Sequence, residues 1–398
     1  MNSDLSIALV GMGGYGVAYV RALLNLREKS GIRFVAAADP APSGCELLPD
    51  VEARRIPIFQ SLEALLDKQK PDLIVLATPP QVHAEQVVLA LEHGHHVLCE
   101  KPVACDPHQV QRMIQARDRA RKVVAVGYQW SFSPAILRMK SDLMAGRFGK
   151  PKKLRTLVLW PRDERYYARN DWAGRQRDSK GRLVLDSPVN NACSHFLHNM
   201  FFVLGPKIDR SDLPMQVEAE LYRANRIDNY DTAVIRCVNR SGAELLFIAS
   251  HATEKSNGPL IEYQFELGMI QFGGEENPEM IGRLSDGSII RYGKPPDAAT
   301  DEKLKVVCTA IREGKPIVCG LEASASQNAC MFAAQQSMPL ISRFPEDMIV
   351  TEGEIGKRVT CARGLDSALK DCYKNFKLPS EIHFEWARPG KVQTIGQE

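Results

Sequence analysis

The spacing of hydrophobic residues changes partway along the chain. As far as residue 127, short apolar runs alternate with segments in which hydrophobic residues recur at helical spacing. Six of the runs predict strands: "SIALV", "FVAAAD", "IPIF", "DLIVLAT", "HHVLCEK" and "VVAVGYQ". Strands that alternate with helices form a parallel sheet covered on both faces. Residues 1–127 are therefore predicted to form a doubly wound Rossmann domain.

Beyond Pro151 the hydrophobic period shortens to two. Runs such as "VEAELYR", "DTAVIRC", "AELLFIAS" and "IEYQFELG" alternate apolar and polar residues, as strands with one buried face do. Helical segments, including "EASASQNACMFAAQQSM", interrupt them. We predict a second α/β domain over residues 128–398.

Composition and charge narrow the function classes. Lys and Arg (51) barely exceed Asp and Glu (48), and the charges are dispersed, so nucleic acid is not an expected partner. The ten cysteines include no C-x-x-C pair, which favours reduced core thiols over disulfides or a zinc site, and no metal is expected. No apolar run approaches the roughly 18 residues of a membrane span, and "MNSDL" leaves no room for a signal peptide. We expect a cytoplasmic protein that binds a small molecule.

The first predicted strand ends in a glycine-rich turn, "GMGGYG". Gly11 suits the tight turn, Gly13 allows a pyrophosphate to approach the backbone, and Gly16 allows the next helix to pack closely. Such a pattern can be an ordinary turn, but its position between a strand and a helix N-terminus favours a dinucleotide. The predicted cofactor contacts here are Gly11, Met12, Gly13, Gly14, Tyr15 and Gly16.

Asp39, at the end of the second predicted strand, is expected to bind the adenosine ribose. Its carboxylate would face the 2′-phosphate of NADP, and the following "PAPSG" contains no arginine to neutralise that phosphate. We therefore expect NAD in preference to NADP.

Further candidates follow the later strands, because ligands of doubly wound sheets lie at the carboxyl ends of the strands. Thr78 and Pro79 stand at one such end, and Glu100 and Lys101 at the next. His83, at the start of the intervening helix, is placed near the cofactor, although it can equally be a polar residue that begins a helix.

The segment "DLIVLATPPQVHAEQVVLALEHGHHVLCEKPVA", with Glu100-Lys101-Pro102, closely resembles the Gfo/Idh/MocA oxidoreductases, whose hallmark is E-K-P after the fifth strand. The resemblance continues in "MAGRFGKPKKLRTLVLW", which looks like the crossing into the second domain of that family. It implies a second domain with a large, open, mainly antiparallel sheet, often used for dimer or tetramer contacts. It also implies NAD(P)-dependent oxidation of a hydroxyl on a sugar, cyclitol or related polyol, or the reverse reaction.

The resemblance gives Lys101 a catalytic and substrate-binding role. An ammonium at the reacting oxygen stabilises the alkoxide charge that develops during hydride transfer. The alternative is a strand-end lysine that is simply solvated.

Proton transfer is expected from "LDSPVNNACSHFLHN", residues 185–199. Members of the family usually carry D-x-x-x-H on a helix, and the alignment places the histidine on His195 and the aspartate on Asn191. Because an amide is not a base, we predict that His195 accepts the proton and that Asn191 positions the substrate hydroxyl. Asp186 is a second candidate base or a cap before a helix that starts near Ser187-Pro188, and His198 is interpreted as structural.

A substrate surface is predicted in "WPRDERYYARNDWAGR", residues 160–175. Sugars present C–H faces that stack on aromatic rings and hydroxyls that need fixed donors. A surface loop whose aromatics fold back on the core is the alternative. The predicted contacts are Trp160, Arg162, Arg169, Asn170 and Trp172.

Together these features predict an NAD-dependent oxidoreductase that acts on a secondary hydroxyl of a sugar, cyclitol or glycoside. Two alternatives stay open. Some relatives oxidise a sugar transiently, eliminate the glycosidic substituent and restore NAD, and so act as glycosidases or lyases. The missing aspartate also allows an NAD-binding protein without catalysis.

Overall fold

The computed structural model describes residues 4–26, 31–297 and 299–396. The chain divides into two compact units, each made of two segments. The first unit comprises Met1–Ser133 and Pro296–Ala325, and the second comprises Pro134–Pro295 and Ser326–Glu398. The sequence pattern predicted one boundary near residue 127, with 296–325 in the second domain. The periodicity of the helix in that segment identifies its buried face but not the sheet against which it packs.

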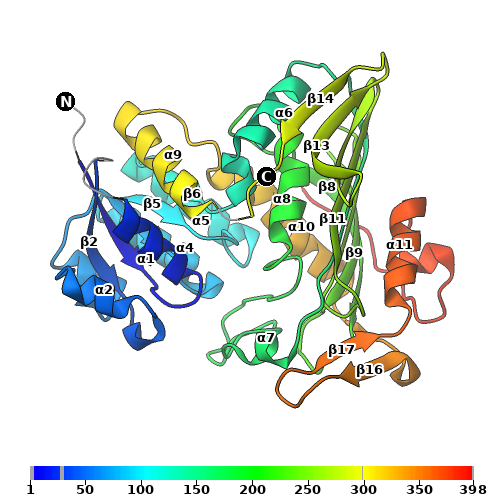
Figure 1. The fold of residues 1–398 in the computed structure, drawn as a ribbon, viewed down its shortest axis with the longest axis horizontal. Coiled ribbons are helices and arrows are strands. Elements are labelled where there is room, and N and C mark those ends of the chain that lie inside the picture. The colour runs from blue at the N-terminus through cyan, green and yellow to red at the C-terminus, as the bar shows by residue number, and fades with distance from the viewer. Residues whose placement is uncertain (1–3, 27–30, 298, 397–398) are drawn as a thin grey trace. The chain divides into compact units, whose positions relative to one another are not determined.

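The first unit is built on a six-stranded parallel sheet, as predicted (Figure 1). The strand order is β3-β2-β1-β4-β5-β6, which is the order of a Rossmann fold. The strands are short, and β1, β4, β5 and β6 are almost wholly buried because helices cover both faces, whereas β2 and β3 are buried only in part. Their bounds are β1 (Leu5–Val10), β2 (Ile32–Ala38), β3 (Ile58–Phe59), β4 (Leu73–Leu76), β5 (His96–Cys99) and β6 (Val124–Val126).

The helices of the first unit begin with recognisable signals. Asp106 caps the longest of the crossover helices by accepting from the Gln109 N–H, with Pro107 as the first helical residue. The last helix, α9, packs against α1 although almost 300 residues separate them. The helices are α1 (Gly16–Asn25), α2 (Leu48–Ala53), α3 (Leu62–Leu66), α4 (His83–Glu92), α5 (Pro107–Ala120) and α9 (Thr300–Glu313), with short 3₁₀ turns at Pro42–Gly44, Pro80–Val82 and Gln129–Phe132.

The second unit contains a large mixed sheet, mostly antiparallel, as the resemblance implied. Its order is β14-β13-β12-β11-β7-β10-β9-β8-β15, with β18 paired to β8, and only the β7–β10 and β8–β15 pairs are parallel. The strands are β7 (Pro151–Leu159), β8 (Pro214–Arg223), β9 (Thr232–Asn239), β10 (Glu244–Ser250), β11 (Asn257–Phe265), β12 (Gly268–Gly273), β13 (Asn277–Leu284), β14 (Ile289–Gly293), β15 (Ser342–Arg343) and β18 (Gln393–Thr394). A separate hairpin pairs β16 (Ile349–Glu352) with β17 (Val359–Ala362).

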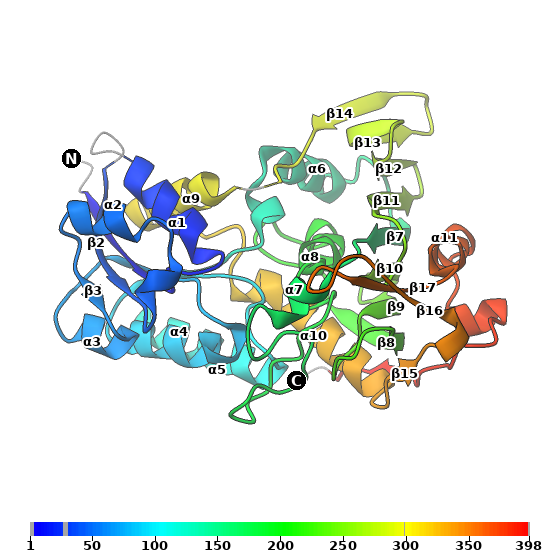
Figure 2. The same cartoon turned by 60° about the horizontal axis from the view of Figure 1, so that its bottom comes forward.

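Helices lie on both faces of this sheet (Figure 2). On one face Leu157, Leu246 and Ile248 pack with Leu365, Leu369 and Cys372 of α11 (Leu365–Asn375) in a buried core. The opposite face of β7 contacts α8 (Ser194–Val203). The remaining helices are α6 (Pro134–Met144), α7 (Glu164–Ala168) and α10 (Leu321–Ser337). The boundary between the two units at residues 325 and 326 lies within α10. Short 3₁₀ turns lie at Glu346–Met348 and Pro379–Ile382.

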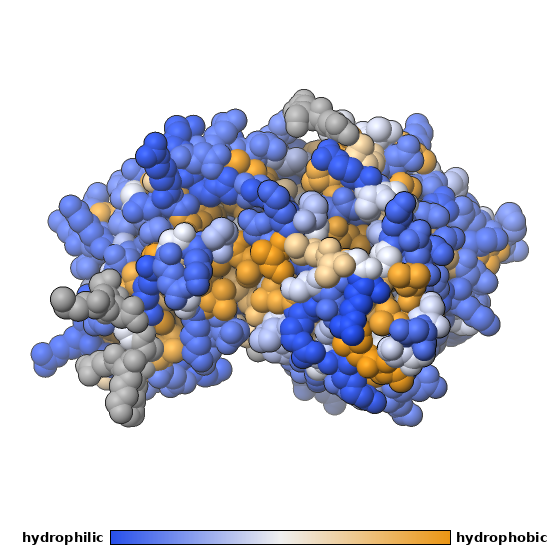
Figure 3. Space-filling model, turned by 90° about the horizontal axis from the view of Figure 1, so that it is seen from above, coloured by the Kyte–Doolittle hydropathy of each residue, from blue (hydrophilic) through white to orange (hydrophobic). Residues whose placement is uncertain are grey.

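The surface and the cysteines agree with the composition. Hydrophilic residues cover most of the face that Figure 3 shows, and hydrophobic residues gather in smaller areas. All ten cysteines are free and buried, as predicted. Within 4–26, 31–297 and 299–396, no helix is both long and apolar enough to cross a membrane, and no cluster of three or more metal-ligating side chains occurs.

Candidate functional site

The glycine-rich turn joins β1 to α1 and has a close-packed side and an open side. Gly11 has a φ of +87°, and a Cβ there would lie 2.6 Å from the carbonyl oxygen of Ala77. A Cβ on Gly16 would lie 2.1 Å from the carbonyl oxygen of Gly11, so only glycine lets α1 start this close to the turn. At Gly13, by contrast, a Cβ would meet no atom within 4 Å.

Asp39 ties this turn to the end of β2. Its Oδ2 accepts from the backbone N–H groups of Met12 at 2.6 Å and Gly13 at 3.4 Å, and its Oδ1 accepts from Ala41 at 2.8 Å. The Met12 side chain is wholly buried, so only the backbone groups of this residue can take part in contacts at the turn. Gly14 and Tyr15, the other predicted contacts, are exposed.

An NAD molecule fits these residues. The backbone at Gly13 is open to the approach of a pyrophosphate, because a Cβ there would meet nothing within 4 Å, and the first turn of α1 contains no acidic residue to repel one. Oδ2 of Asp39 accepts two backbone N–H groups and Oδ1 only one, so Oδ1 has acceptor capacity left for a ribose hydroxyl.

His83 is the first residue of α4, and the cofactor contact predicted for it stays a prediction. Its side chain has no exposed surface, and its ring nitrogens lie 2.8 Å from the carbonyl oxygens of Thr78 and Pro102. Burial lowers the pKa of His83, and the two carbonyls oppose that shift in part. The ring therefore links the loops after β4 and β5, whereas Thr78 and Pro79 themselves reach the surface.

Glu100 forms a buried ion pair with Lys303 of α9. Its Oε1 contacts Nζ of Lys303 and accepts from the Tyr19 hydroxyl at 2.6 Å. The Lys303 side chain is 0% exposed and that of Glu100 is 7% exposed. Burial alone would raise the pKa of Glu100, but Lys303 and the hydrogen bonds outweigh it, so the pKa is lowered. Glu100 is thus a carboxylate inside the first unit.

This carboxylate shapes the turn that carries Lys101. Oε2 of Glu100 accepts from the backbone N–H of Lys101 at 3.1 Å. A Cβ on Gly127 would lie 2.5 Å from Oε1, so the glycine after β6 leaves room for the carboxylate. The oxygens of Glu100 bond to donors of the protein, and the cofactor contact predicted for Glu100 stays a prediction. Lys101 is half-buried at the carboxyl end of β5.

In the second unit, Asp186 gathers three donors. Its Oδ2 accepts from the Gly174 N–H at 2.7 Å and from Arg169 Nη2 at 3.3 Å, and its Oδ1 accepts from Asn191 Nδ2 at 2.8 Å. The side chain is 3% exposed. Burial raises the pKa of Asp186, and Arg169 is the largest influence in the other direction. The structure thus brings together three predicted residues: Asp186, Asn191 and Arg169.

The helix after Asp186 starts later than we predicted. Ser187-Pro188 begins a run of turns, and α8 itself begins at Ser194. Asn191 therefore lies before the helix, where its carbonyl accepts from the Ser194 hydroxyl at 2.8 Å, and does not share a helical face with His195. His195 is half-buried in the first turn of α8.

His198 is wholly buried in the same helix. Its ring stacks on Phe202 with the centroids 5.6 Å apart. Burial, with a smaller influence from Lys140, lowers its pKa to about 3. This environment agrees with the structural role that we predicted for His198.

The arginines and aromatics of residues 160–175 pack on one another. Arg169 lies over the rings of Tyr166 (3.8 Å) and Trp172 (5.2 Å), and Arg162 over those of Tyr166 (5.1 Å) and Trp160 (5.8 Å). Asn170 accepts from the Trp172 N–H at 3.2 Å and orders the loop. Such stacking holds each guanidinium in a fixed direction.

Two residues of this cluster were missed because they come from distant strands and helices. Phe196 of α8 makes an edge contact with Trp160 at 5.5 Å. His251 lies 5.4 Å from the Tyr166 ring, and its Nδ1 is 2.8 Å from the Trp160 carbonyl oxygen. Burial, followed by Arg162, lowers the pKa of His251 to about 3, so it stays neutral.

Lys303 was also missed, although the sequence held a signal for it. In "TDEKLKVVC" it reads as one of several solvated charges. Its helical phase is that of Val307 and Ala310, which are both buried. A charge on the apolar stripe of a helix predicts a buried partner.

The strand order and the glycine turn define the first unit as a dinucleotide-binding Rossmann domain. Residues 5–128 match the family described as "Oxidoreductase family, NAD-binding Rossmann fold", that of the Gfo/Idh/MocA proteins. Over these residues the chain is similar to the NAD-binding Rossmann domains of that oxidoreductase family.

Curated relatives match this part of the chain. Inositol 2-dehydrogenase of Streptomyces avermitilis is 30% identical over 156 residues, which is 39% of this chain and 44% of that protein. Inositol 2-dehydrogenase 4 of Saccharopolyspora erythraea is 32% identical over 158 residues, 38% and 44% of the two chains. The chain thus spans less than half the length of these relatives.

Solved structures extend the likeness of fold to most of the chain. The WlbA dehydrogenase from Bordetella pertussis, in complex with NADH and UDP-GlcNAcA, has a TM-score of 0.69 and 23% identity over 85% of this chain and 97% of that one. The myo-inositol 2-dehydrogenase from Lactobacillus plantarum has a TM-score of 0.67 and 18% identity over 85% and 98%. At these identities the likeness shows the fold.

Proposed function

We propose that this protein is an NAD-dependent oxidoreductase that transfers hydride between the cofactor and a secondary hydroxyl carbon of a sugar, cyclitol or glycoside. The observation that carries the proposal is the turn after β5. There a buried carboxylate, Glu100, holds the backbone of a lysine at the cofactor edge of an NAD-binding sheet. The names of the relatives, inositol and nucleotide-sugar dehydrogenases, support a polyol substrate.

The residues that would hold NAD are those of the glycine turn and Asp39. The backbone at Gly13 and the N-terminus of α1 would receive the pyrophosphate, and Asp39 the adenosine ribose. When bound, NAD supplies the hydride acceptor. Residues 40–44 contain no arginine, which supports NAD over NADP.

In this proposal Lys101 binds the reacting oxygen. Its ammonium stabilises the negative charge that develops on that oxygen as hydride leaves the adjacent carbon. The stabilisation requires a fixed direction of approach. The bond from the Lys101 N–H to Glu100 and the Glu100–Lys303 ion pair supply a rigid turn for it.

His195 accepts the hydroxyl proton in this proposal, and general-base assistance of this kind is worth roughly 10²–10⁴ in rate. Asp186 is the rival base, but three donors already bond to its two oxygens. This arrangement favours an orienting role for Asp186. It directs the Asn191 amide and the Arg169 guanidinium, which then hold substrate hydroxyls.

A substrate panel tests the proposal. The protein is mixed with NAD and with sugars, inositols and chromogenic glycosides, and both NADH and released aglycone are followed. NADH formation that disappears in Lys101→Ala supports the dehydrogenase. Aglycone released without net NADH would favour the redox-assisted glycosidase or lyase instead. NAD binding with neither product would indicate a protein without catalysis on these substrates.

A further inference from the structure

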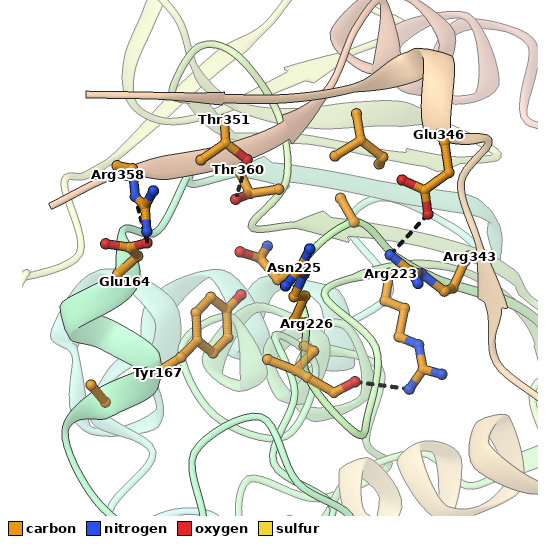
Figure 4. A pocket seen from close by; sticks show the side chains of 14 residues that line it. Glu164, Tyr167, Arg223, Asn225, Arg226, Arg343, Glu346, Thr351, Arg358 and Thr360 are labelled. Atoms are coloured by element: carbon orange, nitrogen blue, oxygen red, sulfur yellow. Dashed lines mark hydrogen bonds and ion pairs between the residues drawn. The ribbon is translucent and has the colours of Figure 1, made fainter. Parts of the chain in front are cut away.

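A cavity lies wholly within the second unit, and none of the residues that line it has been given a catalytic or binding role above (Figure 4). Its volume is about 820 Å³, within the range of roughly 300–1,000 Å³ typical of small-molecule sites. Four segments form its walls: α7, the turn between β8 and β9, the stretch from β15 into β16, and the end of the β16–β17 hairpin. No substrate or cofactor role given above uses it.

The charges around this cavity favour an anion. Four arginines and two glutamates line it, which leaves an excess of two positive charges. Glu164 pairs with Arg358 at 2.6 Å, and Glu346 pairs with Arg343 at 3.2 Å. Both carboxylates are therefore paired with an arginine, and the two excess positive charges are those of Arg223 and Arg226.

Neither of these two arginines is paired with a carboxylate in the ion pairs that the structure describes. Arg223 Nη1 donates to the carbonyl oxygens of Ile227 and Asp228, both at 2.8 Å, and carbonyls fix a guanidinium without neutralising it. Arg226 is exposed, and among the described ion pairs it has no partner. A guanidinium presents planar, paired donors that match phosphate oxygens.

Tyr167 adds a directed donor. Its hydroxyl is buried and has no hydrogen-bond partner among the described residues. In Figure 4 it points toward the side chains of Asn225 and Arg226. Burial, followed by Asp231, raises the pKa of Tyr167 well above its usual value, so the hydroxyl keeps its proton. A buried hydroxyl without a partner costs stability, and a ligand oxygen would remove that cost.

The rest of the lining suits a small organic body. Ala168, Ala224, Ile227 and Ile349 provide apolar surface. The hydroxyls of Thr351 and Thr360, which bond to each other at 2.9 Å, add polar groups to the lining. We propose that this cavity binds a phosphate monoester of a small polyol. Its phosphate, which carries about two negative charges at neutral pH, would match Arg223 and Arg226. This inference does not depend on hydride transfer.

Binding of sugar phosphates to the full chain, without NAD, tests the proposal. Glucose 6-phosphate and ribose 5-phosphate are titrated calorimetrically, with glucose, inorganic phosphate and malonate as comparison ligands. We expect saturable binding of at least one sugar phosphate, at least about tenfold tighter than the comparison ligands. Arg226→Ala should weaken it roughly 10- to 100-fold, and Tyr167→Phe several-fold. Arg240→Ala, an exposed arginine outside the cavity, is the matched control and should change nothing.

Several results would overturn the proposal. The proposal is wrong if neither sugar phosphate binds the wild-type protein. It is also wrong if the Arg226→Ala variant binds a sugar phosphate as tightly as the Arg240→Ala variant does. Equal affinity for inorganic phosphate would reduce the cavity to a simple anion site, and equal affinity for malonate would make it a dicarboxylate site. Because Arg226 is exposed, the unliganded variant should melt at the wild-type temperature.

Discussion

Replacing Lys303 by methionine should destabilise the first unit strongly. Methionine keeps most of the length of the side chain but removes the ammonium from a wholly buried ion pair with Glu100. The carboxylate is then left in the core with the Tyr19 hydroxyl and the Lys101 N–H as its bonds. Removing one partner of a buried ion pair costs about 3–5 kcal/mol, which is a large share of the stability of one domain.

The loss should depend on pH in a defined direction. In the wild-type protein the pKa of Glu100 is lowered, so its stabilisation is present above the unfolded pKa and is lost as the pH falls through the folded pKa. Without Lys303, burial raises this pKa, and the penalty grows as the pH rises through it. The difference in unfolding free energy between the variant and the wild type should therefore shrink as the pH falls from about 8 to about 5.

Hydrogen exchange at the amides of β5 measures this effect within the first unit, because opening free energies report local stability. Lys305→Met is the matched control: it is exposed on the same helix and should change stability by less than about 0.5 kcal/mol. The double variant Glu100→Gln/Lys303→Met should recover part of the loss. If Lys303→Met behaves like Lys305→Met at every pH, the reasoning about the buried pair is wrong.

The remaining predictions concern the proposed chemistry. Lys101→Ala should abolish turnover while calorimetry still detects NAD binding, and unchanged turnover would remove Lys101 from the mechanism. Asn191→Asp places a second carboxylate against Asp186 and should cost about 1–3 kcal/mol; the two would share a raised pKa, so melting temperatures should recover on acidification. NADP should bind the wild type roughly ten- to several-hundred-fold more weakly than NAD, and Asp39→Asn should narrow that difference; equal affinities in the wild type would contradict the selectivity argument.

The fold was predictable because its signals are local. The runs ending at Val10 and Leu76 are buried throughout, the run ending at Ala38 is buried over its last three residues, and all six predicted strands are present in the sheet. The start of α8 was misplaced by seven residues. Pro188 is a good helix-starting residue, but the chain makes irregular turns up to Ser194, held in part by Gln327 of α10, which donates to the Val189 carbonyl. A tertiary contact of this kind has no local pattern.

The contacts around Glu100 and His83 could not be predicted for a related reason. Both residues belong to motifs, and a motif identifies a chemical type without saying where its polar atoms bond. Glu100 bonds to Lys303, more than 200 positions away, and His83 bonds to two backbone carbonyls. Glu100 bonds to the backbone of Lys101 and His83 to that of Pro102, so each holds the turn that carries Lys101, which is a positioning role.

The resemblance implied an aspartate at position 191, and the asparagine found there changes meaning once Asp186 is located. A carboxylate is present there, one hydrogen bond behind the Asn191 amide, and two ionised carboxylates at that separation would repel each other in a buried setting. An amide at 191 avoids this repulsion, because it donates to Asp186 and still has an oxygen suited to a hydroxyl. Asn191 is therefore chemically consistent with its surroundings, which argues against a decayed site. In the proposed reaction the two residues orient substrate, and proton transfer falls to His195.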